Sequence, residues 1–111
     1  MLKTAFTFAF EDFTELESQI QFFAPLREVS KAFDDGYLKW SIAGLGEAYG
    51  FMFKLKSNEK PFIVKTLVNV ADLDPDESIE WLIDSENLEV AQQVFLGLEL
   101  QNITAAWEKE P

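Results

Sequence analysis

The side chains with the most evident chemistry are the carboxylates near the C-terminus. The 111-residue chain has a formal net charge of −11, and eleven carboxylates against one lysine leave −10 on residues 72–111. These carboxylates are Asp72, Asp74, Asp76, Glu77, Glu80, Asp84, Glu86, Glu89, Glu99, Glu108 and Glu110. A field of this size attracts basic surfaces and repels nucleic acid and anionic lipid.

Three of these carboxylates have the spacing of the first half of a calcium-binding loop. Asp72, Asp74 and Asp76 stand at positions 1, 3 and 5, but position 6 is Glu77 instead of glycine and position 12 is Ile83 instead of glutamate. Acidic residues also favour the positive end of a helix dipole. We therefore interpret the segment as the start of a helix and expect no bound metal.

Catalysis has few candidate residues because the chain contains no histidine and no cysteine. The usual zinc ligand sets and histidine-dependent nucleophiles are thereby excluded. The carboxylate pairs at 11–12, 34–35 and 76–77 stand among turn and cap residues, where ordinary solvated acids are expected. Gly44, Gly46 and Gly50 lack the strand–loop–helix context of a phosphate site and indicate hairpin turns. The protein is predicted to be neither an enzyme nor a cofactor carrier.

Alternating apolar residues predict strands at 2–10, 37–43, 48–56 and 61–70. The connections between the last three strands are short and rich in turn residues, which indicates antiparallel neighbours. The inward sets are expected to be Leu2, Phe6, Phe8 and Phe10; Leu38, Trp40 and Ile42; Tyr49, Phe51, Phe53 and Leu55; and Phe62, Val64, Val68 and Val70.

Helical spacing and capping signals predict helices in the remaining segments. Thr14 and Glu17 form a capping box before Leu16, Ile20 and Phe23, and Pro25 should break that helix. A helix at 26–33 follows, with a strand there as the alternative. Asp74 with Glu77 is a second capping box, before an inward stripe of Ile79, Leu82 and Ile83. Ser85 is predicted to cap a last helix, and residues 96–104 fit either a helix end or a strand.

The predicted fold is α+β, with a four-stranded, mainly antiparallel sheet and helices packed on one face, in the order β-α-(α)-β-β-β-α-α. Residues 1–111 are expected to form a single globular domain, with 72–111 as its acidic C-terminal helical segment. Strand parity assigns Lys3, Lys39, Lys54, Lys56 and Lys65 to the exposed sheet face. No apolar run is long enough to span a membrane and no signal-peptide cleavage site follows Met1, so a cytoplasmic location is expected.

These features favour a binding module that neutralises or escorts a basic, nucleic-acid-acting protein, as an immunity protein, an antitoxin or a phage nucleic-acid mimic would. Proteins that act on nucleic acids hold phosphates with lysine and arginine patches, and the carboxylates of a binding module can complement the charge of such a patch. The predicted partner-binding residues are Asp72, Asp74, Asp76, Glu77, Glu80, Trp81, Asp84, Glu86 and Glu89, with Trp81 as an aromatic anchor.

Two alternatives use other parts of the chain. In a self-associating structural protein, a homodimer would form through the exposed sheet face, whose lysines would meet the acidic helices of another copy. Met52, Ile63 and Leu67 lie among these lysines and would supply apolar contacts. A small-molecule site would lie between sheet and helices near Tyr37 and Tyr49. Direct nucleic-acid binding is not expected because the total charge opposes it.

Overall fold

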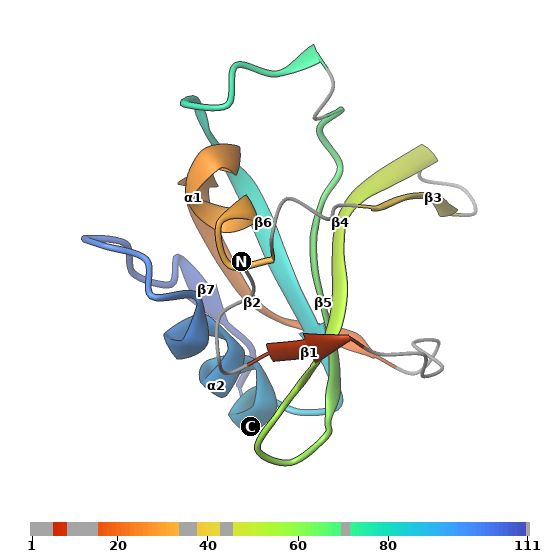
Figure 1. Cartoon of the computed structure of the whole chain (residues 1–111). Coiled ribbons are helices and arrows are strands. Elements are labelled where there is room, and N and C mark those ends of the chain that lie inside the picture. Colours follow the sequence, from red (N-terminus) through yellow and green to blue (C-terminus); the bar gives the residue numbers. More distant parts are fainter. Residues whose placement is uncertain (1–5, 9–15, 34–37, 43–45, 70–71, 111) are drawn as a thin grey trace.

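In the part of the chain that the structure describes, one antiparallel sheet carries two helices on the same face (Figure 1). The computed structural model describes residues 6–8, 16–33, 38–42, 46–69 and 72–110. Its elements are β1 (Phe6–Phe8), β2 (Glu17–Pro25), α1 (Leu26–Ser30), β3 (Leu38–Ile42), β4 (Gly46–Leu55), β5 (Pro61–Thr66), β6 (Ser78–Ser85), α2 (Leu88–Leu98) and β7 (Trp107–Glu108). Neither helix has the length and apolar character needed to cross a bilayer.

The strands follow one another in the order β1-β4-β5-β6-β2-β7, and β3 also pairs with β4. Every pair is antiparallel. A tight turn joins β4 to β5, where the Leu55 amide donates to the Lys60 carbonyl at 2.9 Å and the Glu59 amide donates to the Leu55 carbonyl at 2.8 Å. In contrast, β2 and β6 are far apart in the sequence and meet only in the folded chain, with Phe22 opposite Trp81.

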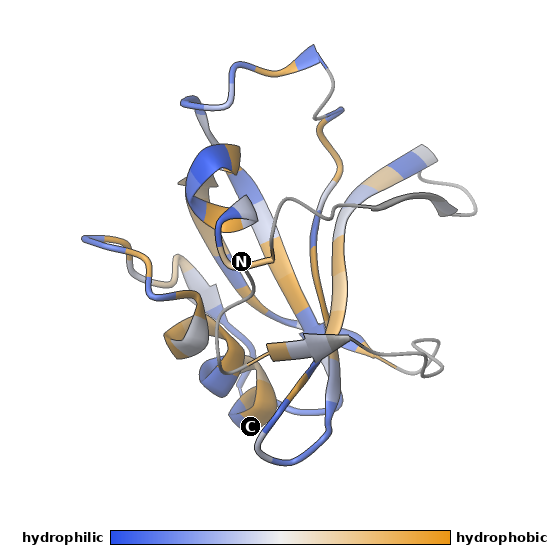
Figure 2. Ribbon diagram, in the orientation of Figure 1, coloured by the Kyte–Doolittle hydropathy of each residue, from blue (hydrophilic) through white to orange (hydrophobic). Residues whose placement is uncertain are grey.

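The core lies between the sheet and the helices. Phe33, which follows α1, stacks on Phe51 and Phe53 with ring centroids 4.6 and 5.0 Å away. Phe95 of α2 meets Phe22 of β2 edge-on at 5.3 Å. Hydrophobic residues accordingly occupy the middle of the central strands and one side of α2, whereas the β4–β5 turn is hydrophilic (Figure 2).

The predicted helix at 14–24 is wrong, because Glu17–Pro25 is the strand β2. Its residues alternate, so that Ile20, Phe22 and Ala24 are buried while Phe23 points to the other face with 48% of its surface exposed. The helical spacing of Leu16, Ile20 and Phe23 is therefore coincidental. Thr14 lies outside the described residues.

The predicted helix that begins at Asp74 is also wrong, since Ser78–Ser85 is the strand β6. The Asp74 carboxylate does accept a backbone hydrogen bond, from the Asp76 amide at 2.9 Å. That bond closes a turn before a strand, because the same side-chain geometry serves turns and helix caps alike. Ile79, Trp81 and Ile83 then alternate into the core.

The remaining predicted elements are confirmed with shifted ends. The helix expected after Ser85 is α2, but its N-cap is Asn87, whose side chain accepts from the Val90 amide at 2.9 Å. It ends at Leu98, and Glu99 adopts a left-handed conformation with φ 53°. The helix at 26–33 is the shorter α1, and β3 lies within its predicted range. β4 begins two residues before the predicted 48–56 and ends one residue earlier, and β5 stops at Thr66.

The inward residues predicted for β4 are confirmed, since Tyr49, Phe51, Phe53 and Leu55 are all buried. On β5 Phe62 and Val64 are buried, but Val68 lies beyond the strand with 39% exposure. Ile63, which was expected on the exposed face, is also buried, with 7% exposure. Of the first predicted strand only β1 is described, and its Phe6 is buried. The α+β class and the antiparallel sheet with helices on one face stand, whereas four strands and four helices were the wrong numbers.

Candidate acidic binding site

The structure divides the C-terminal carboxylates among several places. Asp72, Asp74, Asp76 and Glu77 lie in the connection that precedes β6, and Glu86 and Glu89 follow its far end. Because β6 has eight residues, it is about 23 Å long at 3.3 Å per residue, and it separates these two groups. The acids therefore do not form one helical face.

The carboxylates before β6 are tied to α1. The Arg27 side chain contacts Asp76 with Nε 2.6 Å from Oδ1, and the Arg27 amide donates to the Pro75 carbonyl at 3.0 Å. This ion pair holds the pKa of Asp76 below its usual range. Asn69 donates to Asp72 at 3.2 Å. Within the described residues no cluster of acidic side chains has the arrangement of a metal site.

Trp81 is completely buried, so the aromatic anchor expected there is not on the surface. Its indole N–H donates to the Ala24 carbonyl at 2.9 Å, and its ring stacks with Phe51 at 6.2 Å between centroids. A partner has no access to this side chain in the folded protein.

Asp84 is also buried, with 6% of its side chain exposed. Its carboxylate accepts from the Ser18 hydroxyl at 2.7 Å and from Lys65 Nζ at 2.6 Å. Through these contacts the Asp84 side chain links β6 to both neighbouring strands, whereas Glu80 on the same strand is exposed.

Two of the five lysines assigned to the exposed sheet face are paired with carboxylates. Lys65 pairs with Asp84, and Lys54 lies 3.9 Å from Glu59. Lys56 is exposed beyond the end of β4, and the side chains of Lys3 and Lys39 lie outside the described part of the structure.

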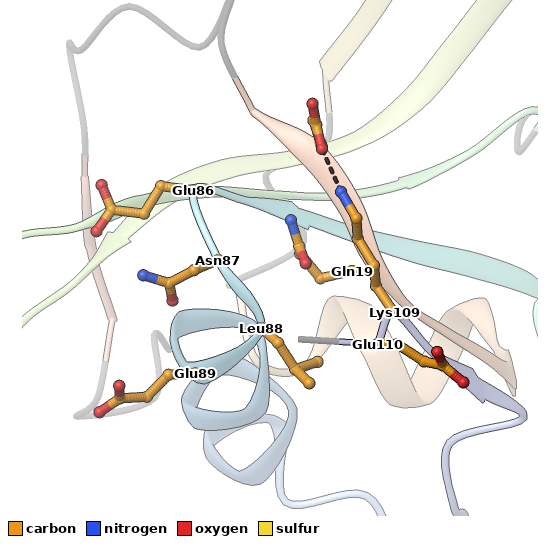
Figure 3. A pocket seen from close by; sticks show the side chains of 8 residues that line it. Gln19, Glu86, Asn87, Leu88, Glu89, Lys109 and Glu110 are labelled. Carbon is orange, nitrogen blue, oxygen red and sulfur yellow. Dashed lines mark hydrogen bonds and ion pairs between the residues drawn. The ribbon is translucent and has the colours of Figure 1, made fainter.

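The carboxylates beyond β6 border a pocket of about 440 Å³ (Figure 3). The first residues of α2 form one wall, and the edge formed by β2 and the C-terminal segment forms the other. The lining residues are Glu17, Gln19, Glu86, Asn87, Leu88, Glu89, Lys109 and Glu110.

Two of the four carboxylates in this pocket are paired. Lys109 contacts Glu17, and this contact lowers the pKa of Glu17; Lys60 lies 3.2 Å from Glu86. Within the described residues neither Glu89 nor Glu110 makes an ion pair. Among the described residues, the pocket thus has two carboxylates without an ion-pair partner.

Of the predicted partner-binding residues, the structure brings Glu86 and Glu89 together in this pocket and adds Glu17 and Glu110. The local sequence carried no signal for Glu17, because its position depends on β2 pairing with a strand more than sixty residues away. Comparison of the chain with family models, curated proteins and solved structures found no match.

Proposed function

We propose that this protein is a non-enzymatic, acidic binding module that acts in the cytoplasm on a basic, nucleic-acid-acting protein. An immunity protein for a nuclease toxin, an antitoxin or a nucleic-acid-mimicking inhibitor would each work in this way. The observation that carries the proposal is the pocket between α2 and the C-terminal segment, where Glu89 and Glu110 lack a cationic partner among the described residues.

The chemistry of the pocket suits a lysine or arginine side chain. Such a cation would approach a protein of net charge −11, and complementary fields of this kind raise association rates. At the pocket it would meet Glu89 and Glu110, for which the described residues supply no ion-pair partner. Lys109 and Lys60 are held by Glu17 and Glu86, so they repel an incoming cation less than free lysines would.

Two double variants with the same net charge test this proposal. Glu89→Gln with Glu110→Gln removes two charges from the pocket, and Asp74→Asn with Glu77→Gln removes two from the connection before β6. The probe is a synthetic peptide of alternating arginine and serine, titrated into the full chain by calorimetry.

The pocket variant should bind the peptide more weakly than the control variant. Exposed ion pairs contribute about 0.2–1 kcal/mol each, so two lost pairs correspond to a roughly twofold to thirtyfold loss at about 1.4 kcal/mol per tenfold. Wild-type affinity should fall between about 0.05 M and about 0.5 M salt. Equal losses in the two variants, or no binding at low salt, would contradict the proposal.

A further inference from the structure

Two exposed aromatic residues occupy diagonal positions of the β2–β7 pair, on the sheet face opposite the helices. Trp107 and Phe23 are 46% and 48% exposed. Among the described residues, the other exposed large hydrophobic side chains are aliphatic. Trp107 stands directly opposite Gln21 in the β2–β7 pair, and Phe23 is two residues further along β2. Such diagonal neighbours are about 7–8 Å apart, within reach of aromatic rings.

A carboxylate completes this surface. Glu80 is directly opposite Phe23 in the β2–β6 pair, and its Oε2 accepts from Gln21 Nε2 at 2.8 Å. Leu82 stands opposite Gln21 and is half-buried. We call the exposed side chains of Trp107, Phe23 and Glu80 the aromatic patch.

Backbone pairing holds the aromatic patch in place. The Ala106 amide donates to the Gln21 carbonyl and the Lys109 amide to the Gln19 carbonyl, each at 2.7 Å, so the backbone is bound to β2 on both sides of Trp107. Lys109 also contacts Glu17. Because the backbone around Trp107 is held before any partner arrives, it does not have to be ordered on binding.

We propose that the aromatic patch is a second contact surface for the basic partner, where an arginine or lysine side chain lies against the rings and is met by Glu80. A cation over an aromatic face is attracted by the ring quadrupole, and a neighbouring carboxylate adds a charge-assisted hydrogen bond. This inference rests on the proposed function and replaces the buried Trp81 with an accessible anchor. Arginine is the better fit because its planar guanidinium can stack on an aromatic ring and donate two hydrogen bonds to a carboxylate.

Charge favours this occupant over a second copy of the chain. A two-fold symmetric dimer through the aromatic patch would bring together two copies of the same surface, each with Glu80 and a total charge of −11. Of the lysines assigned to the exposed sheet face, Lys65 is engaged by Asp84 and Lys54 by Glu59, which reduces the positive charge that could attract a second copy.

The test uses the full chain and the alternating arginine–serine peptide. Trp107→Ala and Phe23→Ala should each weaken binding by about threefold to thirtyfold, whereas Trp107→Phe should keep most of the affinity. The matched control is Leu96→Ala, which removes a 76% exposed side chain from α2. The peptide with lysine in place of arginine should bind less tightly to the wild-type chain.

Circular dichroism checks that each variant is folded, and Phe23→Ala with Glu80→Gln decides the question if Trp107→Ala lowers stability. Affinities of the aromatic variants equal to that of Leu96→Ala would overturn the inference and leave the proposed function to the pocket variants. If peptide affinity falls in the pocket variants but not in the aromatic variants, the inference about the aromatic patch is likewise overturned and the proposed function is retained. A wild-type dimer in light scattering that Trp107→Ala dissociates would also overturn it, because the occupant would then be a second copy.

Discussion

Replacement of Asp84 by alanine should destabilise the fold and leave partner recognition intact. The Asp84 side chain is 6% exposed and that of Lys65 is 19% exposed, and the two are joined at 2.6 Å. Without the carboxylate, Lys65 keeps a largely buried charge and the Ser18 hydroxyl loses its acceptor. A structural role for Asp84 is thus separable from the partner-binding role that its sequence position indicates.

The magnitude follows from the burial of the pair. Breaking a buried ion pair by removing one partner costs about 3–5 kcal/mol, and the exposure of Lys65 places Asp84→Ala near the lower end, at about 3 kcal/mol. Glu80→Gln on the same strand removes the same charge from an exposed position and should cost less than about 0.5 kcal/mol. Replacing both members, Asp84→Leu with Lys65→Met, should recover most of the loss because no buried charge remains unpaired.

Urea unfolding followed by tryptophan fluorescence and by circular dichroism measures these differences, with an unchanged denaturant slope showing that the unfolded state is comparable. Peptide binding by folded Asp84→Ala should match the wild type. If Asp84→Ala were within about 0.5 kcal/mol of Glu80→Gln, or if the double variant were less stable than the single one, the structural assignment of Asp84 would be refuted.

Two further predictions concern the backbone and the acidic connection. Gly50→Ala should lower the free energy of unfolding by about 3 kcal/mol, because the new Cβ would lie 2.1 Å from the Val64 carbonyl oxygen on the neighbouring strand. Gly46 has φ +98° and open space around it, so Gly46→Ala should cost only about 1–2 kcal/mol of left-handed strain. Equal losses of the two variants in urea unfolding would contradict this. The Arg27 contact lowers the pKa of Asp76. The contact therefore stabilises the folded protein at pH values above the pKa of Asp76 in the unfolded chain, and this stabilisation is lost as the pH falls through the pKa of Asp76 in the folded protein. A carboxyl titration by NMR should show the Asp76 pKa rising towards its ordinary value in Arg27→Gln, and an unchanged pKa would refute the role of the ion pair.

The candidate site was predictable only in part. The charge of residues 72–111 pointed to Glu86 and Glu89, which do line the acidic pocket. It also pointed to Asp84 and Trp81, which the fold buries. Net charge reports how many carboxylates a segment has, but their accessibility depends on which side of a strand each one occupies.

The exposed aromatic residues illustrate the same limit. Phe23 fits an inward helical stripe in sequence, yet the period of a strand turns it outward. The position of Trp107 depends on the pairing of the C-terminal segment with β2 at the edge of the sheet. Neither placement has a local signal.

The sequence alone determined the charge, the absence of histidine and cysteine chemistry, and the elements whose signals are local. The hairpin of β4 and β5 has clear alternation and a short turn, and α2 has an apolar stripe over eleven residues. Only the tertiary structure decided that Glu17–Pro25 and Ser78–Ser85 are strands. Segments of eight or nine residues with several apolar positions fit both periods, so the long-range pairing of β2 with β6 selects the strand and with it the residues that reach the surface.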